Sequence, residues 1–399
     1  MTTGVGGSTI EAELAALAPW ATPAPGITPD ERAARIEYMR RQMSEQNVDA
    51  VLIGAGPSLN YFAGVPWGAS ERLVAMILYA RRAPVLIAPM FELGSLRADL
   101  AIEAKVRCWE EDEDPFALTA AALAEASVSR LAIDPAMAFH MVARLQVAGP
   151  TLDVMDATPL IDGCRMVKSP AELALMSQAK AMTLEVHRRT ARILRTGITA
   201  TAVRRFIEQG HRALGADGNS FCIVLFGRAT AYPHGLPGEQ ILSEGDVVLI
   251  DTGCFVQGYS SDITRTYVYG EPTPEHRRIW AIEREAQQAA FDAVRPGVAC
   301  EAVDAAARAV LVKAGLGPDY RLPGLPHRTG HGIGLAIHEA PYLVRGDSTP
   351  MQPGMCFSNE PMIVVPGEFG VRLEDHFHVT ETGAAWFTQP SPSIEDPFG

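Results

Sequence analysis

The chain has 399 residues, of which 47% are hydrophobic and 20% charged, and its formal net charge at pH 7 is −13. This length exceeds that of one ordinary hydrophobic core, so we expect two domains. The acidic balance argues against nucleic acid and anionic membrane as main partners, and no stretch approaches the ~20 apolar residues of a membrane span.

Cysteine usage and the N-terminal sequence bear on the cellular compartment. The six cysteines are scattered and include no CxxC pair. The N-terminus lacks the charged start and apolar run of a secretory signal. Together these features predict a reduced, cytoplasmic protein whose partners are small molecules and copies of itself.

In chain order, a loose arm and an α/β domain come first. Residues 1–25 are rich in Gly, Ala, Thr and Pro, which predicts a loose N-terminal arm. A helix is expected to begin after Thr28, because this capping residue is followed by a proline and two acidic residues. Alternation of strands and helices predicts an α/β domain over residues 26–160. Its expected strands include 50–53, 73–79 and 84–88.

A second domain is expected over residues 166–399. The segment 158–171 is punctuated by proline and glycine, which makes it the best boundary. Helical patterns dominate from 169 to about 214 and return near 275–295 and 300–314, with strands between and after them. Helices that are segregated from hairpins predict an α+β domain.

Five potential metal ligands recur in this second domain, each in a short distinctive context. Four carboxylates and one imidazole suit a pair of divalent ions that share bridging carboxylates. Two such ions make a strong nucleophile from water at neutral pH, so the set predicts a metal-dependent hydrolase. The ligands are Asp251 in IDTG, Asp262 in SSDITRT, His331 in RTGHGIG, Glu360 in SNEPM and Glu374 in GVRLED.

Two predicted hairpins bring the acidic residues together. Asp251 follows an apolar strand and Asp262 begins the returning one, so a two-residue loop would place them opposite each other. Directly opposed carboxylates repel, and a cation is therefore expected between them. Glu360 and Glu374 are nearly equidistant from Gly367, so a turn centred there would pair them in the same way.

Several histidines accompany the ligand motifs. His234 in YPHG, His327 in PHRTGH and His338 in AIHEAP lie in Gly- or Pro-bounded segments, where both a catalytic and a structural role stay open. His376 and His378 follow Glu374 on the same strand. We assign these two structural roles, because the ligand set is already complete without them.

At these motifs the chain resembles the pita-bread metallopeptidases, the family of prolidase, aminopeptidase P and methionine aminopeptidase. The resemblance is strong over residues 166–399, and all the family's ligand positions are occupied by the expected residue type. The length before residue 166 points to the prolidase and aminopeptidase P branch, and the pattern looks most like the shorter bacterial Xaa-Pro dipeptidases. The implied fold is an α+β pita-bread domain preceded by a smaller α/β domain of the creatinase and prolidase type.

The resemblance implies a cofactor of two divalent metal ions. Asp251 would bind one ion, His331 and Glu360 would bind the other, and Asp262 and Glu374 would bridge both. Manganese is the first expectation, with zinc or cobalt as alternatives, because carboxylate-rich sites accept several of these metals.

The resemblance also implies a mechanism. A hydroxide between the metals would attack the carbonyl that precedes proline, and Glu360 would accept the proton from the bridging water. His338 would stabilise the oxyanion, and His234 would contact the proline end or carboxylate of the substrate. His327 matches a histidine of the same branch, and Arg372 would hold neighbouring carboxylates in place.

The residues that read the substrate are less defined. Phe221 is a candidate for an apolar proline slot, although ordinary core packing also explains it. The chain lacks the extended segment that carries the carboxylate-reading arginine of larger prolidases. Tyr232, Arg345 or a residue of a partner subunit could take that role, since the resemblance implies a homodimer.

Three other functions stay open beside an Xaa-Pro dipeptidase. An aminopeptidase P would act on longer Xaa-Pro peptides, and chain-length preference would distinguish it. A non-peptidase hydrolase or lyase on the same fold, or a binding protein without catalysis, would usually have lost or altered ligands. The complete ligand set therefore argues against both.

Overall fold

The computed structural model describes residues 2–399, and these residues form two compact units. The smaller unit is Ile27–Arg165. The larger unit joins the N-terminal residues up to Gly26 to Met166–Gly399. Each unit has its own cluster of buried apolar side chains, as expected for separate domains.

The smaller unit is built on a six-stranded sheet with the order β4-β3-β2-β1-β5-β6. Strand β1 is antiparallel to β2 and parallel to β5. The strands are β1 (Ala50–Gly54), β2 (Ala75–Tyr79), β3 (Val85–Pro89), β4 (Lys105–Trp109), β5 (Arg130–Ile133) and β6 (Asp153–Asp156). The helices are α2 (Pro29–Glu45), α3 (Pro57–Ala63), α4 (Leu93–Asp99), α5 (Pro115–Glu125), α6 (Phe139–Ala148) and α7 (Thr158–Arg165), with a 3-10 turn η1 (Met90–Glu92).

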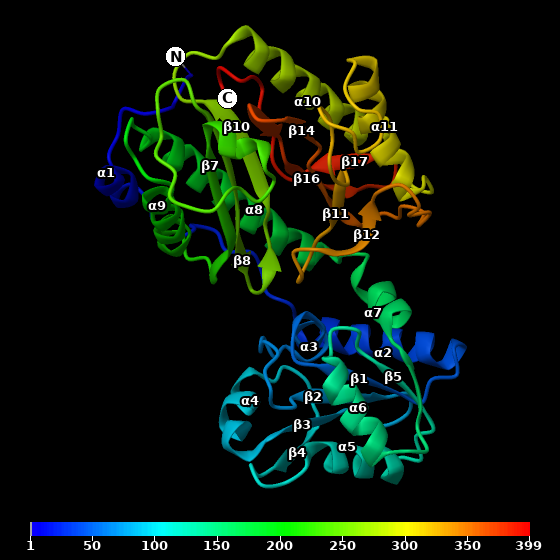
Figure 1. The fold of residues 1–399 in the computed structure, drawn as a ribbon. Helices are drawn as coiled ribbons and strands as arrows, with labels where there is room; N and C mark the ends of the chain where they lie inside the picture. The colour runs from blue at the N-terminus through cyan, green and yellow to red at the C-terminus, as the bar shows by residue number, and fades with distance from the viewer. Residues whose placement is uncertain (1) are drawn as a thin grey trace. The chain divides into compact units, whose positions relative to one another are not determined.

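Helices cover both faces of this sheet, so its central strands are apolar throughout (Figure 1). Leu52 packs in one cluster with Phe116 of α5 and Leu145 of α6. Val51 points to the other face, where it is fully buried and where α3 contacts β1. The predicted start of α2 is confirmed, because the Thr28 hydroxyl accepts a hydrogen bond from the Glu31 amide (3.2 Å).

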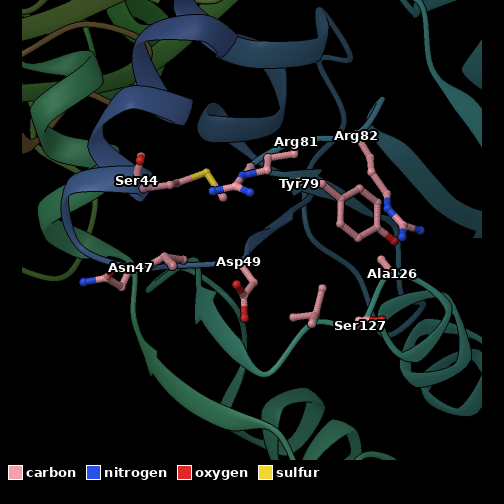
Figure 2. A pocket seen from close by; sticks show the side chains of 12 residues that line it. Ser44, Asn47, Asp49, Tyr79, Arg81, Arg82, Ala126 and Ser127 are labelled. Carbon is pink, nitrogen blue, oxygen red and sulfur yellow. The ribbon is translucent and has the colours of Figure 1, made fainter.

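A polar pocket of about 400 Å³ lies in the smaller unit, where β1 begins and β2 ends (Figure 2). Arg81 and Arg82 line it together with Asp49. The Asp49 carboxylate accepts the backbone N–H groups of Ser129 and Arg130 (both 2.9 Å). The acid of this pocket therefore holds the turn into β5.

The larger unit combines helical pairs with antiparallel sheets. One sheet has the order β10-β8-β7, with β9 paired to β8, and another has the order β12-β11-β13-β16-β17, while β14 and β15 form a hairpin. The strands are β7 (Gly218–Phe226), β8 (Val247–Val256), β9 (Tyr259–Ser260), β10 (Ile263–Val268), β11 (Gly330–Gly332), β12 (Glu339–Leu343), β13 (Cys356–Asn359), β14 (Met362–Val365), β15 (Phe369–Arg372), β16 (Asp375–Val379) and β17 (Ala384–Trp386). The helices are α1 (Ile10–Ala15), α8 (Pro170–Arg192), α9 (Ala200–Ala213), α10 (Pro274–Ala293) and α11 (Cys300–Lys313), with a 3-10 turn η2 (Gly227–Ala231).

The helix starts of the larger unit follow from local capping chemistry. At α8, the Ser169 hydroxyl accepts from the Glu172 amide (3.2 Å) while the Glu172 carboxylate accepts from the Ser169 amide (2.9 Å). This is a capping box, and Thr273 forms a similar one at α10. Helices α10 and α11 pack side by side over the core of the second sheet (Figure 1).

The N-terminal segment differs from the predicted loose arm. The Thr2 hydroxyl donates to the carbonyl of Val268 (2.7 Å), and the Thr3 amide donates to the carbonyl of Glu395 (2.7 Å). Helix α1 begins after the Thr9 cap and packs beside α9 (Figure 1). The prediction was wrong for the described part of residues 1–25, because the partners that order it lie far along the chain.

The remaining sequence expectations concern membranes and thiols. Within residues 2–399, no helix has both the length and the apolar composition that crossing a bilayer requires. All six cysteines lie among the described residues and are free thiols.

Candidate metal centre

Buried carboxylates and imidazoles from separate strands of the larger unit converge at one place. Four of the five predicted ligands belong to shared groups, which makes them one connected cluster. Asp251 is the fifth, and its carboxyl group lies within hydrogen-bond reach of that of Asp262. Among residues 2–399, the groups whose ligand atoms lie within 4.8 Å of one another are Asp262–His331–His338, Asp262–Glu374–His376 and His331–Glu360–Glu374.

Arg372 on β15 links Asp251 to Glu374 through Thr264. Its guanidinium forms an ion pair with Asp251, and its Nε donates to the Thr264 hydroxyl (3.0 Å). That hydroxyl in turn donates to Glu374 Oε2 (2.9 Å). These contacts are those expected of a residue that holds carboxylates in place, and Arg372 is buried among them.

The first hairpin places its two aspartates diagonally. Asp251 on β8 pairs with Thr264 on β10, so the predicted direct opposition of Asp251 and Asp262 was wrong. The turn consists of Gln257 and Gly258, and Val256 pairs with Tyr259 across it, which sets the register two residues away from the predicted one. Asp262 lies two residues before Thr264 and so shares its face, which keeps both aspartates on the same side of the sheet.

The second hairpin has the predicted register. Asn359 pairs with Asp375 and Met362 pairs with Arg372, which leaves Glu360 level with Glu374. Both glutamates lie in matching breaks, Glu360 between β13 and β14 and Glu374 between β15 and β16. At such breaks a side chain is free of the strand's regular alternation and can turn toward the cluster.

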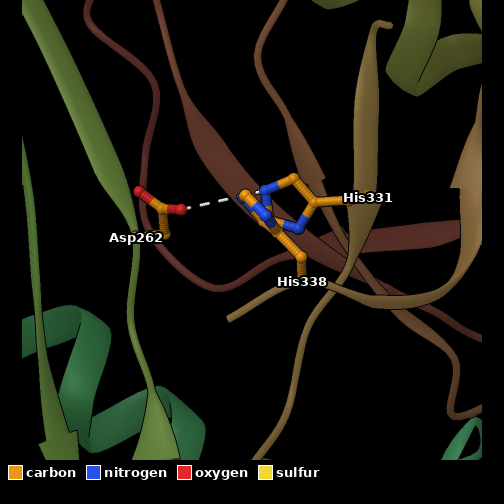
Figure 3. A group of neighbouring side chains, drawn as sticks. All are labelled: Asp262, His331 and His338. Carbon is orange, nitrogen blue, oxygen red and sulfur yellow. Dashed lines mark ion pairs between the residues drawn. The ribbon is translucent and has the colours of Figure 1, made fainter. Parts of the chain in front are cut away.

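His331 is held in a single orientation on β11. Its Nδ1 lies 3.0 Å from the carbonyl of Gly332, and its amide donates to the Ser358 hydroxyl (2.9 Å). When Nδ1 carries the proton, Nε2 is left with a lone pair, which is the form that binds metal. Figure 3 shows this ring directed at Asp262, with Nε2 at 3.8 Å from Oδ2. A glycine is required at 330, since a Cβ there would lie 2.1 Å from the Ser358 carbonyl oxygen.

Three polar atoms of the five predicted ligands have no hydrogen-bond partner among residues 2–399. They are Asp251 Oδ1, Asp262 Oδ1 and His331 Nε2, and all three are buried. Nε2 of His331 lies 3.1 Å from Glu360 Oε1 without hydrogen-bond alignment. Buried acceptors without donors are costly, and bound cations would satisfy them. The donor set of oxygens and one imidazole nitrogen therefore fits divalent metal ions.

The pKa shifts of the clustered carboxyl groups indicate a site that favours the binding of positive charge. Burial raises the pKa of Asp251. Burial and repulsion by neighbouring carboxylates raise the pKa values of Asp262 and Glu374 well above their usual range. Burial also disfavours ionised Glu360, but the imidazoles of His331 and His327 and the charge of Arg372 outweigh it and lower its pKa to about 2. Glu360 is thus ionised at neutral pH.

The predicted catalytic histidines His338 and His234 and the predicted substrate-binding His327 all interact electrostatically with residues of this site. The His338 ring contacts the His331 ring, with centroids 4.1 Å apart (Figure 3). Burial and the charges of His331 and Arg328 lower the pKa of His338 to about 4, and His234 contributes to the same shift. His327 Nδ1 donates to the Arg328 carbonyl (2.7 Å), and His327 contributes to the lowered pKa of Glu360.

The predicted substrate-reading residues have mixed positions. Phe221 on β7 is half-buried, and its carbonyl accepts from the Thr252 hydroxyl (2.8 Å). Tyr232 follows η2 and packs against the core of the second sheet. Arg345 forms an ion pair with Asp319 (2.5 Å), and both side chains are exposed at the surface.

His376 is the residue of this site that the sequence prediction missed. We assigned it a structural role, but its ligand atom lies within 4.8 Å of those of Asp262 and Glu374. The available signal was its position two residues after the predicted ligand Glu374. His378, assigned the same role, is half-buried, and its ring lies 5.2 Å from that of Phe387.

Comparisons with known proteins place this arrangement in a family. The model of metallopeptidase family M24 matches residues 174–381, and that of the creatinase/prolidase N-terminal domain matches residues 35–167. The chain belongs to metallopeptidase family M24. It is therefore a hydrolase of a family that uses divalent metal ions, and the predicted pita-bread fold with a creatinase-type N-terminal domain is confirmed.

Similar M24 proteins carry dipeptidase names. The chain is 39% identical over 355 residues to a probable dipeptidase PepE of Mycobacterium tuberculosis, covering 88% of this chain and 93% of that one. It is 31% identical to an Xaa-Pro dipeptidase of Lactobacillus helveticus, covering 90% and 98%.

Solved M24 structures agree with these sequence relatives. Dipeptidase PepE from Mycobacterium ulcerans has a TM-score of 0.83 at 36% identity, with 92% of this chain and 97% of that chain covered. A prolidase from Thermococcus sibiricus has a TM-score of 0.83 at 30% identity, covering 90% and 96%. The X-Pro aminopeptidase from Thermotoga maritima has a TM-score of 0.75 at 26% identity, covering 87% and 97%.

Proposed function

We propose that the chain is a dinuclear metal-dependent exopeptidase that hydrolyses the Xaa-Pro bond of dipeptides. The observation that carries this proposal is the cluster in which Asp251 Oδ1, Asp262 Oδ1 and His331 Nε2 are buried without hydrogen-bond partners among the described residues. The dipeptidase and Xaa-Pro dipeptidase names of its relatives support the substrate class.

Two divalent ions would be held by the five clustered residues. In our assignment Asp251 holds one ion and His331 and Glu360 the other, while Asp262 and Glu374 are shared. Ions bound there would supply a nucleophilic hydroxide from water at neutral pH and polarise the carbonyl before proline. We propose manganese as the physiological metal, with zinc and cobalt as alternatives.

In the proposed reaction Glu360 accepts a proton and His338 stabilises the oxyanion. The Glu360 carboxylate is ionised, accepts a hydrogen bond from the Ser358 hydroxyl (3.2 Å) and keeps 15% of its side chain exposed. It can therefore take a proton from an attacking water. The His338 imidazole is neutral at pH 7, so its remaining N–H is available to stabilise an oxyanion.

The rest of the proposal concerns substrate and assembly. His234 and His327 would contact the prolyl end of the substrate, Tyr232 would bind near its carboxylate and Phe221 would border the proline ring. The acidic charge of the chain favours a small peptide substrate over nucleic acid or a membrane surface. We further propose that the protein is cytoplasmic and that it forms a homodimer. Gel filtration with light scattering tests the homodimer directly.

The first experiment is peptide hydrolysis by chelated protein with and without added manganese. Ala-Pro and Leu-Pro are compared with the tripeptide Ala-Pro-Ala at equal concentration, and proline or amino-acid release is measured. Manganese-dependent cleavage of the dipeptides with little cleavage of the tripeptide is the expected outcome. The Asp251→Asn variant serves as a matched control that should be inactive with every peptide.

Aminopeptidase P activity is the second candidate, favoured by the similarity to the X-Pro aminopeptidase of Thermotoga maritima. That structure has a lower identity than the dipeptidase and prolidase structures, which places it second. Cleavage mainly of Ala-Pro-Ala would replace the dipeptidase assignment with this one. Metal-bound protein that cleaves none of the peptides would contradict both.

A further inference from the structure

His376 lies beside the carboxylate that we assign to both metal ions. Glu374 directly precedes β16 and His376 lies on it, and His376 Nε2 is 3.4 Å from Glu374 Oε1. Asp375 points to the other face, where its carboxylate pairs with Arg265 (2.7 Å). His376 pairs across the ladder with Ser358, whose hydroxyl contacts Glu360, so this face is the one that borders the cluster.

The contacts of Glu374 are divided between its two oxygens. Oε2 accepts a hydrogen bond from the Thr264 hydroxyl (2.9 Å), and Oε1 lies 3.4 Å from His376 Nε2, at the long end of the hydrogen-bond range. A carboxylate oxygen has two acceptor positions. With one protein donor on each oxygen, Glu374 keeps one acceptor position on each for a cation.

Nε2 is the nitrogen of His376 that has a partner. The side chain is fully buried, and its Nδ1 has no hydrogen-bond partner among residues 2–399. Glu374 Oε1 lies within hydrogen-bond reach of Nε2, and a carboxylate oxygen can only accept, so Nε2 is the donor of this contact.

We propose that His376 is a positioning residue of the metal centre. Its Nε2–H donates to Glu374 Oε1 and, together with the Thr264 hydroxyl on Oε2, fixes the plane in which the carboxylate presents itself to two cations. Hydrogen-bond donors behind metal ligands typically change metal affinity by about 10- to 100-fold. This inference rests on the proposed dinuclear centre and adds a residue to it.

The test is the affinity of chelated protein for manganese, measured by isothermal titration calorimetry. His376→Leu removes the donor and is expected to weaken manganese binding by about 10- to 100-fold. His376→Gln puts an amide N–H near the position of Nε2 and should restore the affinity to within a few-fold of the wild type. His378→Leu, on the same face of β16, is the matched control and should bind as the wild type does.

Each alternative result has a separate meaning. Wild-type affinity in His376→Leu would overturn the proposal. A loss in His376→Leu that His376→Gln does not restore would also overturn it, and would indicate that the imidazole binds metal directly. Wild-type protein that binds no divalent ion would instead contradict the metal centre itself. Circular dichroism checks folding first, and His376→Phe replaces the leucine variant if that variant does not fold.

Discussion

At the scale of single residues, the proposed metal centre is defined by which ligand atoms have protein hydrogen-bond partners and which do not. Asp251 uses one oxygen for Arg372 and leaves the other unpaired, while Glu374 has a protein contact on both of its oxygens. An unsatisfied buried acceptor costs about 1–3 kcal/mol, so three of them would be expensive in a site that stays empty. These unpaired acceptors thus make a local unfavourable contribution to the free energy of folding, which cation binding offsets.

Replacement of His338 separates catalysis from metal binding. His338→Ala should lower kcat for Leu-Pro by about 100- to 1,000-fold, because removal of one oxyanion donor typically has that effect. Manganese content, measured by mass spectrometry after desalting, should stay at the wild-type level. Asp262→Asn is the matched variant that should lose both activity and metal. Metal loss in His338→Ala would contradict the oxyanion role and make the Asp262–His331–His338 group a metal site.

At the scale of elements, helix α8 holds the segment that contains Asp262. Lys180, Thr183 and His187 lie along one face of the helix and are fully or almost fully buried. They contact three residues around Asp262. Lys180 Nζ donates to the Ser260 carbonyl (3.1 Å), Thr183 Oγ1 contacts Ser261 Oγ (2.6 Å) and His187 Nε2 lies 2.9 Å from the Ile263 carbonyl. The helix therefore fixes the segment on both sides of Asp262.

The buried ammonium of Lys180 predicts a specific pH dependence of stability. Burial lowers its pKa from 10.5 to about 8, so between these values the folded chain has released a proton that the unfolded chain still binds. Stability contributed by this group therefore rises with pH across that window, by roughly 3 kcal/mol in total. Below pH 8 both states are charged and the full cost of burial remains.

The measurement compares the thermal midpoints of chelated wild-type protein and Lys180→Met from pH 7 to pH 10. The wild type should gain stability relative to the variant as the pH rises above about 8. Lys313→Met, at an exposed position of α11, controls for the loss of a lysine charge and should run parallel to the wild type. If the thermal midpoints of Lys180→Met and the wild type changed in parallel with pH, the lowered pKa of Lys180 would be contradicted.

At the scale of the whole molecule, the proposed metal ligands all belong to the larger unit, although each unit has its own core. A ligand that binds only the folded state stabilises it, by about 2.7 kcal/mol at a concentration 100-fold above Kd. The smaller unit contains none of the residues of this cluster. Metal binding is thus expected to stabilise the larger unit and to leave the stability of the smaller unit unchanged.

Scanning calorimetry with and without a chelator tests this division. Removal of metal should lower the transition of the larger unit by roughly 5–10 °C, given 2–4 °C per kcal/mol for a unit of this size. The transition of the smaller unit should stay where it is. A single transition that moves as a whole would show that the two units unfold together.

Local chemistry explains which parts of the fold were predictable. Helix starts such as those after Thr28 and Ser169 depend on neighbouring residues, and the sequence contains those neighbours. The ligand motifs were predictable for a similar reason, because each is contained in a few residues. The diagonal placement of Asp251 and Asp262 was not, since it depends on which two residues form the turn. Gln257 and Gly258 both have positive φ (49° and 80°), as tight two-residue hairpin turns require.

Contacts between distant segments account for the other differences. His376 became part of the site only when β16 came to lie against β10, beside Asp262. The N-terminal segment was expected to be loose because its composition is that of a linker. Its order comes from Val268, Gly270 and Glu395, which no local pattern reveals.

The docking of the N-terminal segment also has a consequence for the order in which the molecule is made. Thr2 is synthesised before Val268, whose carbonyl it binds and which lies 266 residues later. At about 5–20 residues per second, that partner is synthesised roughly 13–50 seconds afterwards. Helix α1 has six residues, which is too short to persist alone in water. The smaller unit is therefore synthesised before the residues that the N-terminal segment binds, so this segment can dock only after translation has passed Val268.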